Sequence, residues 1–209
     1  MQVLVIRHGE TDWNRAGRVQ GRMDTSLNSN GQAQARALAE SLRGLHIERV
    51  ISSPLLRCVQ TASAFTSDMQ FDERLREQDF GSVQGKTFKE WRTEAPEEYA
   101  RYSSGDADFQ PGGGESRRQV QTRTVAAMHE HCAHASQEGV RSIALFTHGG
   151  VVSAWWREIN QLPITALRTW QVPNCGINEF SFTHTQGWQV VRFADVKHLE
   201  HLSLDEINH

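Results

Sequence analysis

The N-terminal segment constrains the fold more than any other stretch of the chain. Val3 to Ile6 form an unbroken apolar run, and the run ends abruptly in the charged sequence Arg7-His8-Gly9-Glu10. A short run of branched and long aliphatic side chains is typical of a strand that is covered on both faces of a parallel sheet. Ligands of such sheets bind beyond the carboxyl ends of the strands. The pattern therefore predicts a central strand that presents Arg7 and His8 at a binding edge.

The same design recurs far along the chain. Ile143 to Phe146 are apolar, and Thr147-His148-Gly149-Gly150 follows directly. Arg49 to Ser52 indicates a further short strand, after which Ser53 is predicted to cap a helix with Pro54 at its first position.

Arg57 then lies in the first turn of that helix, where free N–H groups favour an anion. By itself such an arginine is usually a solvated surface residue. Together with Arg7, His8 and His148 at one edge, however, it makes a compact positive pocket that suits a phosphoryl group.

These segments resemble the histidine phosphatase superfamily, which includes the phosphoglycerate mutases. Arg7-His8-Gly9-Glu10 with Thr11 and Trp13-Asn14 resembles the opening motif, and the His148 segment resembles the one with the second histidine. Ser53-Pro54, Arg57 and Gln60-Thr61-Ala62 are similar to the third motif. The resemblance covers nearly the whole chain. With the alternation of strand and helix patterns, it predicts a three-layer α/β/α sandwich with a mainly parallel central sheet.

The resemblance implies a role for each matching residue. His8 would be the nucleophile that accepts the phosphoryl group, and Arg7, Arg57 and His148 would hold its oxygens. Gln20-Gly21 resembles the pair that lines the phosphate pocket in the phosphatase branch, although by composition alone this loop could equally be a connecting turn. The substrate-binding residues expected from these motifs are Asn14, Gln20, Gly21, Ser53 and Gly149. No metal or cofactor is expected, because the cationic side chains take the place of Mg²⁺.

The charged stretch from Phe71 to Gly85 would alone be interpreted as a solvated loop. Leu75 to Gly81, followed by Gln84-Gly85, resembles the family's segment with the catalytic acid. Glu77 takes the place of the carboxylate that protonates the leaving alcohol, and Asp79 is the competing candidate.

The chain from residue 1 to 209 is expected to form one domain with a small insertion at about 86–110 over the site. Charged and aromatic residues alternate in the insertion, and this pattern predicts short helices broken at Pro96. Its aromatic residues could line a wall of the site or form a small core of their own. Pro111 to Ser116 resembles a Gly-Gly-Glu-Ser turn with one additional glycine.

A helix predicted over 117–137 carries His129, His131 and His134. At ~100° per residue, His129 and His134 lie about 140° apart around the axis, so three metal ligands could not converge from this helix. We expect no metal there. The core face of the helix is drawn through Val125, Met128, Cys132 and Ala135.

The remaining patterns predict a helix from Gly31, a helix over Val151 to Ile159, a closing hairpin and a polar tail. The first helix is expected to bury Ala35, Leu38, Leu42 and Leu45 and to leave Gln34 on another face. The hairpin pairs Glu179 to Phe182 with Trp188 to Phe193. The tail runs from Lys197, and its last few residues are expected to be disordered.

Composition excludes several classes of partner. A net charge of −3 and a pI near 6.4 give no general attraction to nucleic acid or to anionic membranes. No apolar run is long enough to span a bilayer or to serve as a signal segment. The three cysteines fit neither a disulfide framework nor a paired zinc motif, so reduced thiols and a cytoplasmic location are expected. A homodimer remains open.

The sequence therefore predicts a phosphoric monoester hydrolase of the histidine acid phosphatase type, a metal-independent phosphomonoesterase that forms a phosphohistidine on a small phosphorylated metabolite. The alternatives are a phosphoglycerate mutase and an inactive binder of phosphorylated ligands. One argument against the mutase is the loop after Asn14, which reads Arg18-Val19-Gln20-Gly21. It does not resemble the Phe-Thr-Gly-Trp version of this loop in mutases. The stretch between Glu77 and Glu115 is also short for a mutase lid.

Overall fold

Among residues 1–183 and 185–199, which the computed structural model describes, six strands form one sheet in the order β3-β2-β4-β1-β5-β6. The parallel strands are β1 (Gln2–Arg7), β2 (Arg49–Ser52), β3 (Gln70–Phe71) and β4 (Ser142–Thr147). β5 (Ile177–Thr183) and β6 (Gly187–Asp195) form the predicted hairpin and join β1 in antiparallel fashion. The sheet is therefore mainly parallel, as predicted.

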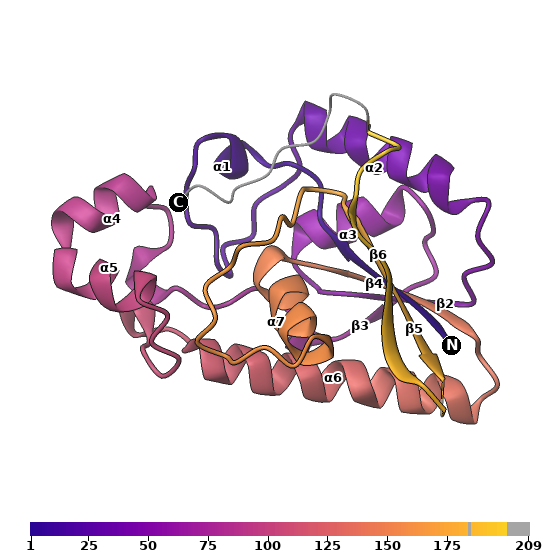
Figure 1. Cartoon of the computed structure of the whole chain (residues 1–209). Coiled ribbons are helices and arrows are strands. Elements are labelled where there is room, and N and C mark those ends of the chain that lie inside the picture. The colour runs from indigo at the N-terminus through magenta and orange to yellow at the C-terminus, as the bar shows by residue number, and fades with distance from the viewer. Residues whose placement is uncertain (184, 200–209) are drawn as a thin grey trace.

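Helices cover both faces of the sheet (Figure 1). On one face lie α2 (Ser29–Leu42) and α3 (Leu56–Ser63), and on the other α6 (Arg117–Gln137) and α7 (Gly149–Ile159). The shorter helices are α1 (Asp12–Arg15), α4 (Phe88–Glu94) and α5 (Pro96–Ser103), with 3-10 turns η1 (Glu73–Leu75), η2 (Gly81–Val83) and η3 (Pro111–Gly113). The three-layer sandwich is confirmed. No helix in the described part of the chain has the length and apolarity needed to cross a bilayer.

The apolar residues of β1 pack into two different hydrophobic cores, one on each face of the sheet. Val3 and Val5 pack with the α6–α7 side, whereas Leu4 and Ile6 pack with the α2–α3 side. Successive strand residues point to opposite faces. Because both faces are covered, all four side chains are fully buried, which explains why the run contains no polar residue.

The predicted insertion forms α4 and α5, and Pro96 is the first residue of α5. Trp91 is fully buried in a third cluster with Phe80, Phe88, Tyr99 and Tyr102. Its ring centroid lies 4.9 Å from that of Tyr102 and 5.4 Å from that of Tyr99. The aromatic residues of the insertion therefore form a core of their own, and Phe88, Tyr99 and Tyr102 also line the cavity described below.

Two helix starts differ from prediction. The helix after β2 begins at Leu56 with Leu55 as its N-cap, not at Ser53-Pro54. The reason is that the Ser53 N–H continues the ladder to β4 by donating to the Phe146 carbonyl at 2.9 Å. Arg57 remains in the first turn. α2 begins at Ser29 rather than Gly31, because Asn28 caps it by accepting the Gly31 N–H at 2.8 Å.

Gln34 is fully buried, so its predicted place on the polar face is wrong. Its side-chain oxygen accepts the Glu10 N–H at 2.8 Å, and this bond compensates the burial. On α6 the predicted core face is correct at Met128, Cys132 and Ala135, whereas Val125 is only partly buried. In the tail, Leu199 packs into the α2–α3 core, and the predicted disordered end lies outside the described residues.

The histidines of α6 turn to different neighbours. His131 Nε2 lies 2.8 Å from Asp72 Oδ2 on the loop after β3. The His129 ring packs edge-on against Trp155, with 5.3 Å between centroids. Within the described residues, no three His, Cys, Asp or Glu side chains are placed to hold a metal ion.

Candidate active site

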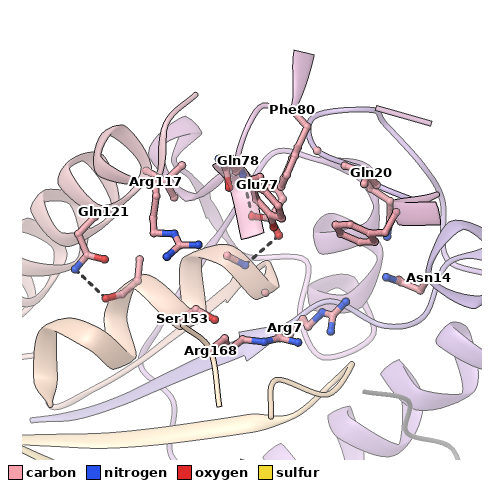
Figure 2. A pocket seen from close by; sticks show the side chains of 18 of the residues that line it. Arg7, Asn14, Gln20, Glu77, Gln78, Phe80, Arg117, Gln121, Ser153 and Arg168 are labelled. Atoms are coloured by element: carbon pink, nitrogen blue, oxygen red, sulfur yellow. Dashed lines mark hydrogen bonds between the residues drawn. The ribbon is translucent and has the colours of Figure 1, made fainter. Parts of the chain in front are cut away.

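The carboxyl ends of β1 and β4 meet at one edge of the sheet, where Arg7 is in register with Thr147. His8 and His148 follow directly, and their ring centroids lie 5.2 Å apart. A cavity of about 410 Å³ opens over this edge (Figure 2). Of the predicted site residues, it is lined by Arg7, His8, Asn14, Gln20, Gly21, Arg57, Glu77 and Gly149.

His8 is buried and held in one tautomer. Its Nδ1 lies 2.7 Å from the carbonyl oxygen of Gly9. A carbonyl only accepts, so Nδ1 carries the proton and Nε2 keeps its lone pair. Burial, followed by the positive charges of Arg57 and Arg7, lowers the pKa of His8 well below its usual value. The site therefore presents a neutral imidazole with a nucleophilic Nε2.

His148 does not line the cavity itself but contacts Arg57, which does. It is fully buried. Nδ1 accepts a hydrogen bond from Nε of Arg57 at 3.2 Å, so Nε2 carries the proton and donates to Ser53 Oγ at 2.8 Å. Burial, and then the charge of Arg57, lowers the pKa of His148 well below its usual value. Both histidines are thus neutral near pH 7.

Ser53 contacts His148 rather than lining the cavity. It is fully buried and accepts a hydrogen bond from His148. That Ser53 contacts the ligand stays a prediction. Its place follows from the extra ladder bond to Phe146, which keeps it in the plane of the sheet.

Arg57 and Arg7 bring fixed positive charge to the cavity. Arg57 is fully buried and donates from Nη1 to the Met23 carbonyl and from Nη2 to the Gly21 carbonyl, both at 2.8 Å. Arg7 donates from Nη1 to the Val172 carbonyl at 2.6 Å. Because backbone groups hold both guanidinium groups, an anion meets cations that need no rearrangement.

Polar side chains of the first loop line the next wall of the cavity. Gln20 Oε1 accepts hydroxyl hydrogen bonds from Thr11 at 3.0 Å and Thr25 at 2.7 Å. Asn14 Oδ1 accepts the Thr11 N–H at 3.1 Å. With the oxygen of Gln20 engaged, its amide nitrogen is the end that can donate to a ligand.

Glu77 is the carboxylate at the cavity. Its Oε2 accepts the Gly150 N–H at 3.1 Å, at the N-terminus of α7, and Oε1 accepts the Gln78 N–H at 2.8 Å. A Cβ on Gly150 would lie 2.2 Å from Oε1, so this approach depends on the glycine. Figure 2 shows Glu77 reaching into the cavity from its loop.

Asp79, the competing carboxylate, has a structural task. Its Oδ1 accepts the Gly81 N–H at 2.8 Å, and the residue does not line the cavity. Glu115 holds the same loop by accepting the Asp79 N–H at 3.0 Å and two bonds from Arg123, both at 2.9 Å. Arg123 also donates to the Glu77 carbonyl at 3.0 Å. The structure therefore favours Glu77 over Asp79 as the acid.

Sequence reasoning missed several cavity residues. The most prominent are the cations Arg117, Arg157 and Arg168. The first and third lie in segments without any motif. A signal existed for the second, because Gly149, Ser153 and Arg157 are spaced four residues apart and so share one face of a helix.

Comparison with known proteins gives one family. A model of the histidine phosphatase superfamily (branch 1) matches residues 3–196. A relative from Salmonella choleraesuis, named "Probable phosphoglycerate mutase GpmB", is 34% identical over 215 residues, covering 99% of each chain.

Solved structures of similar fold carry phosphatase names. Phosphoserine phosphatase from Entamoeba histolytica, in complex with 3-phosphoglyceric acid, superposes with a TM-score of 0.83 at 27% identity, over 95% of this chain and 98% of that one. A mycobacterial glucosyl-3-phosphoglycerate phosphatase gives 0.79 at 30% identity, over 93% and 99%.

Proposed function

Because the chain belongs to the histidine phosphatase superfamily, branch 1, we propose that it is a metal-independent phosphomonoesterase of the histidine acid phosphatase type, acting on a small phosphorylated metabolite. One observation carries the proposal. His8 donates from Nδ1 to the Gly9 carbonyl and has a lowered pKa, so a neutral imidazole presents Nε2 beside the fixed cations Arg7 and Arg57.

In the first step, Nε2 of His8 attacks the phosphorus of the bound ester. The N–P bond forms as the bond from phosphorus to the leaving oxygen breaks, and Glu77 gives that oxygen a proton. Arg7 and Arg57 stabilise the charge on the transferring oxygens, because they already point at the site before the reaction.

In the second step, water attacks the phosphohistidine. Glu77, now a carboxylate, takes a proton from the water while the new P–O bond forms and the N–P bond breaks. His8 returns to its neutral form and inorganic phosphate leaves. One carboxylate thus serves as acid and then as base.

The runner-up is a phosphoglycerate mutase, which the names of the sequence relatives favour. The names of the structural neighbours support a hydrolase instead. A mutase must exclude water while its intermediate reorients, and that requires a closed cover. Here the segment between Glu77 and Glu115 supplies only the short helices α4 and α5 beside the cavity.

A panel of phosphate esters, incubated without added metal, tests the proposal by released inorganic phosphate. We expect release from simple esters to exceed interconversion of 2- and 3-phosphoglycerate, with or without a bisphosphoglycerate primer. Faster interconversion than hydrolysis of any ester would replace the hydrolase with the mutase. Binding of esters without any turnover would instead establish an inactive binder.

We also propose a cytoplasmic location. Cys58, Cys132 and Cys175 are all buried and unbridged. Burial raises the pKa of the Cys58 and Cys132 thiols to about 12, which keeps them protonated. Buried reduced thiols are ordinary in a reducing compartment, and fractionation with antibody detection tests the assignment.

A further inference from the structure

The cavity contains a second group of cations that the proposed phosphoryl site does not use. Arg117 is the first residue of α6, Arg157 lies on α7, and Arg168 lies on the loop that follows α7. All three line the cavity. Figure 2 shows Arg117 and Arg168 reaching into it from these different elements.

Arg157 is the most buried of the three, with 6% of its surface exposed. Its hydrogen bonds go only to carbonyl groups, from Nε and Nη2 to Ala166 at 3.3 and 3.0 Å and from Nη1 to Ser153 at 3.3 Å. Its guanidinium carbon stacks 4.9 Å from the centroid of the Trp170 ring. These contacts fix the side chain but supply no negative charge.

The arginines act on one another as like charges. Burial, followed by the charges of Arg117 and Arg168, lowers the pKa of Arg157 to about 10. Arg157 therefore stays cationic near neutral pH in spite of the repulsion. Clustered like charges destabilise a folded chain unless a ligand compensates them.

Arg117 is also without a carboxylate partner. Its one hydrogen bond within the described chain runs from Nη1 to the Ile164 carbonyl at 3.4 Å. By contrast, its neighbour Arg118 does not line the cavity and pairs with Asp108, with 2.6 Å between Nε and Oδ1. In the described chain the guanidinium groups of Arg117 and Arg157 are thus held by carbonyl oxygens, and such cations in a concave site are suited to an anion.

Tyr102 adds a neutral donor to the group. It lines the cavity, and the positive charges of Arg117 and Arg168 are among the influences on the pKa of its phenol. Burial raises the pKa of its phenol, so the hydroxyl keeps its proton. An anion held by the arginines would have a hydroxyl donor beside it.

We propose that Arg117, Arg157 and Arg168 bind a second anionic group of the substrate, so that the enzyme selects phosphate monoesters that also carry a carboxylate or a second phosphate. This inference rests on the proposed function, since Arg7, His8 and Arg57 hold the phosphoryl group at the other part of the cavity. Guanidinium groups donate paired N–H bonds to either kind of anion. The cavity volume of about 410 Å³ suits a small molecule.

The test compares Arg117→Gln and Arg168→Gln with the matched control Arg118→Gln. The substrates are 3-phosphoglycerate with its carboxylate, 1,3-propanediol bisphosphate with its second phosphate, and glycerol 3-phosphate with neither. In the two cavity variants kcat/KM should fall by about 10–100-fold for the doubly anionic esters, as expected for a lost charged hydrogen bond. It should change by less than about 3-fold for glycerol 3-phosphate, and Arg118→Gln should match the wild type. Which doubly anionic ester the wild type prefers identifies the second group.

Equal losses for all three esters would overturn the inference, as would wild-type preference for glycerol 3-phosphate. In both cases glycerol 3-phosphate is still hydrolysed, so the proposed function survives. If the wild type hydrolyses no ester, the proposed function fails, and calorimetry on the unreacting protein decides the inference separately. 3-Phosphoglycerate should then bind about 10–100-fold more tightly than glycerol 3-phosphate, and this advantage should disappear in Arg117→Gln. Equal binding of the two ligands would reject the second anion site.

Discussion

Replacing Gly150 with alanine should misplace the proposed acid without harming the fold. The new Cβ would lie 2.2 Å from Oε1 of Glu77 in the present arrangement. Gly150 is a helical residue of α7, where alanine is the better helix former by about 1 kcal/mol. The free energy of unfolding should therefore stay the same or rise, while the carboxylate is pushed away.

The size of the effect follows from the clash. To reach an ordinary contact, Oε1 must retreat by about 1 Å, and a misplacement of this size can reduce a rate ~10²-fold. General acid catalysis as a whole contributes ~10²–10⁴-fold. Gly150→Ala should thus lower kcat/KM for an alkyl ester such as glycerol 3-phosphate by about 10²-fold, and Glu77→Gln should lower it at least as much.

The assay is kcat/KM for glycerol 3-phosphate against p-nitrophenyl phosphate, because kcat/KM reports the first step and leaves out the hydrolysis step in which Glu77 also acts. The p-nitrophenolate leaving group departs with little help from a proton. We expect a loss of less than about 10-fold with the aryl ester in both variants. In the double variant the two losses should not add, because both act through one carboxylate.

Equal losses for both esters, or additive losses in the double variant, would refute the assignment of Glu77. A matched comparison is Asp79→Asn, which should not show the dependence on the leaving group, because Asp79 does not line the cavity.

Four further predictions concern the nucleophile, the pH dependence of its activity, the pH dependence of stability and the aromatic cluster. His8→Ala should abolish both turnover and a phosphoramidate label that is labile in acid and stable in alkali; label in that variant would exclude His8. Because the pKa of His8 is lowered and only the neutral imidazole attacks, the acid limb of kcat/KM should lie below pH ~6.5. A limb at or above that value would contradict the lowered pKa. Because the pKa values of His8 and His148 are lowered in the native state, the unfolded chain binds more protons than the native one below pH ~6.5. The free energy of unfolding should therefore fall as the pH drops from ~6.5 toward the lowered native pKa values. Urea titrations at two pH values check this, and His148→Gln should show a smaller drop. Trp91→Ala should cost about 3–5 kcal/mol, seen as a lower urea midpoint, because the side chain is fully buried.

The parts of the site that follow directly from strand ends could be predicted from the sequence. An apolar run with no polar interruption fixes a buried strand, and the residues after it must lie at the sheet edge. This logic places Arg7 and His8, and it places His148 because β4 is the neighbour of β1. The motif predicts Glu77 as the acid, and Glu77 lines the cavity whereas Asp79 does not.

What could not be predicted depends on partners that are distant in sequence. Ser53 faces His148 across 95 positions, and Gln34 is buried because of a bond to Glu10, 24 positions away. No local pattern carries such information. Arg117, Arg157 and Arg168 likewise come from α6, α7 and a loop, and only the folded chain brings them to one cavity.

The additional glycine of the Pro111–Ser116 turn shows how the acid and the cations are held by different means. Gly114 packs on the backbone of the acid's loop so closely that a Cβ would lie 2.2 Å from the Asp79 carbonyl oxygen, and the Glu115 N–H donates to the same oxygen at 2.8 Å. A Cβ on Gly113, in contrast, would meet nothing within 4 Å in the described chain. The turn can therefore hold an extra residue at its surface and still fix the loop of Glu77. The cations instead depend on the sheet edge and its neighbouring carbonyls, so changes in this turn should alter leaving-group dependence while phosphate binding is retained.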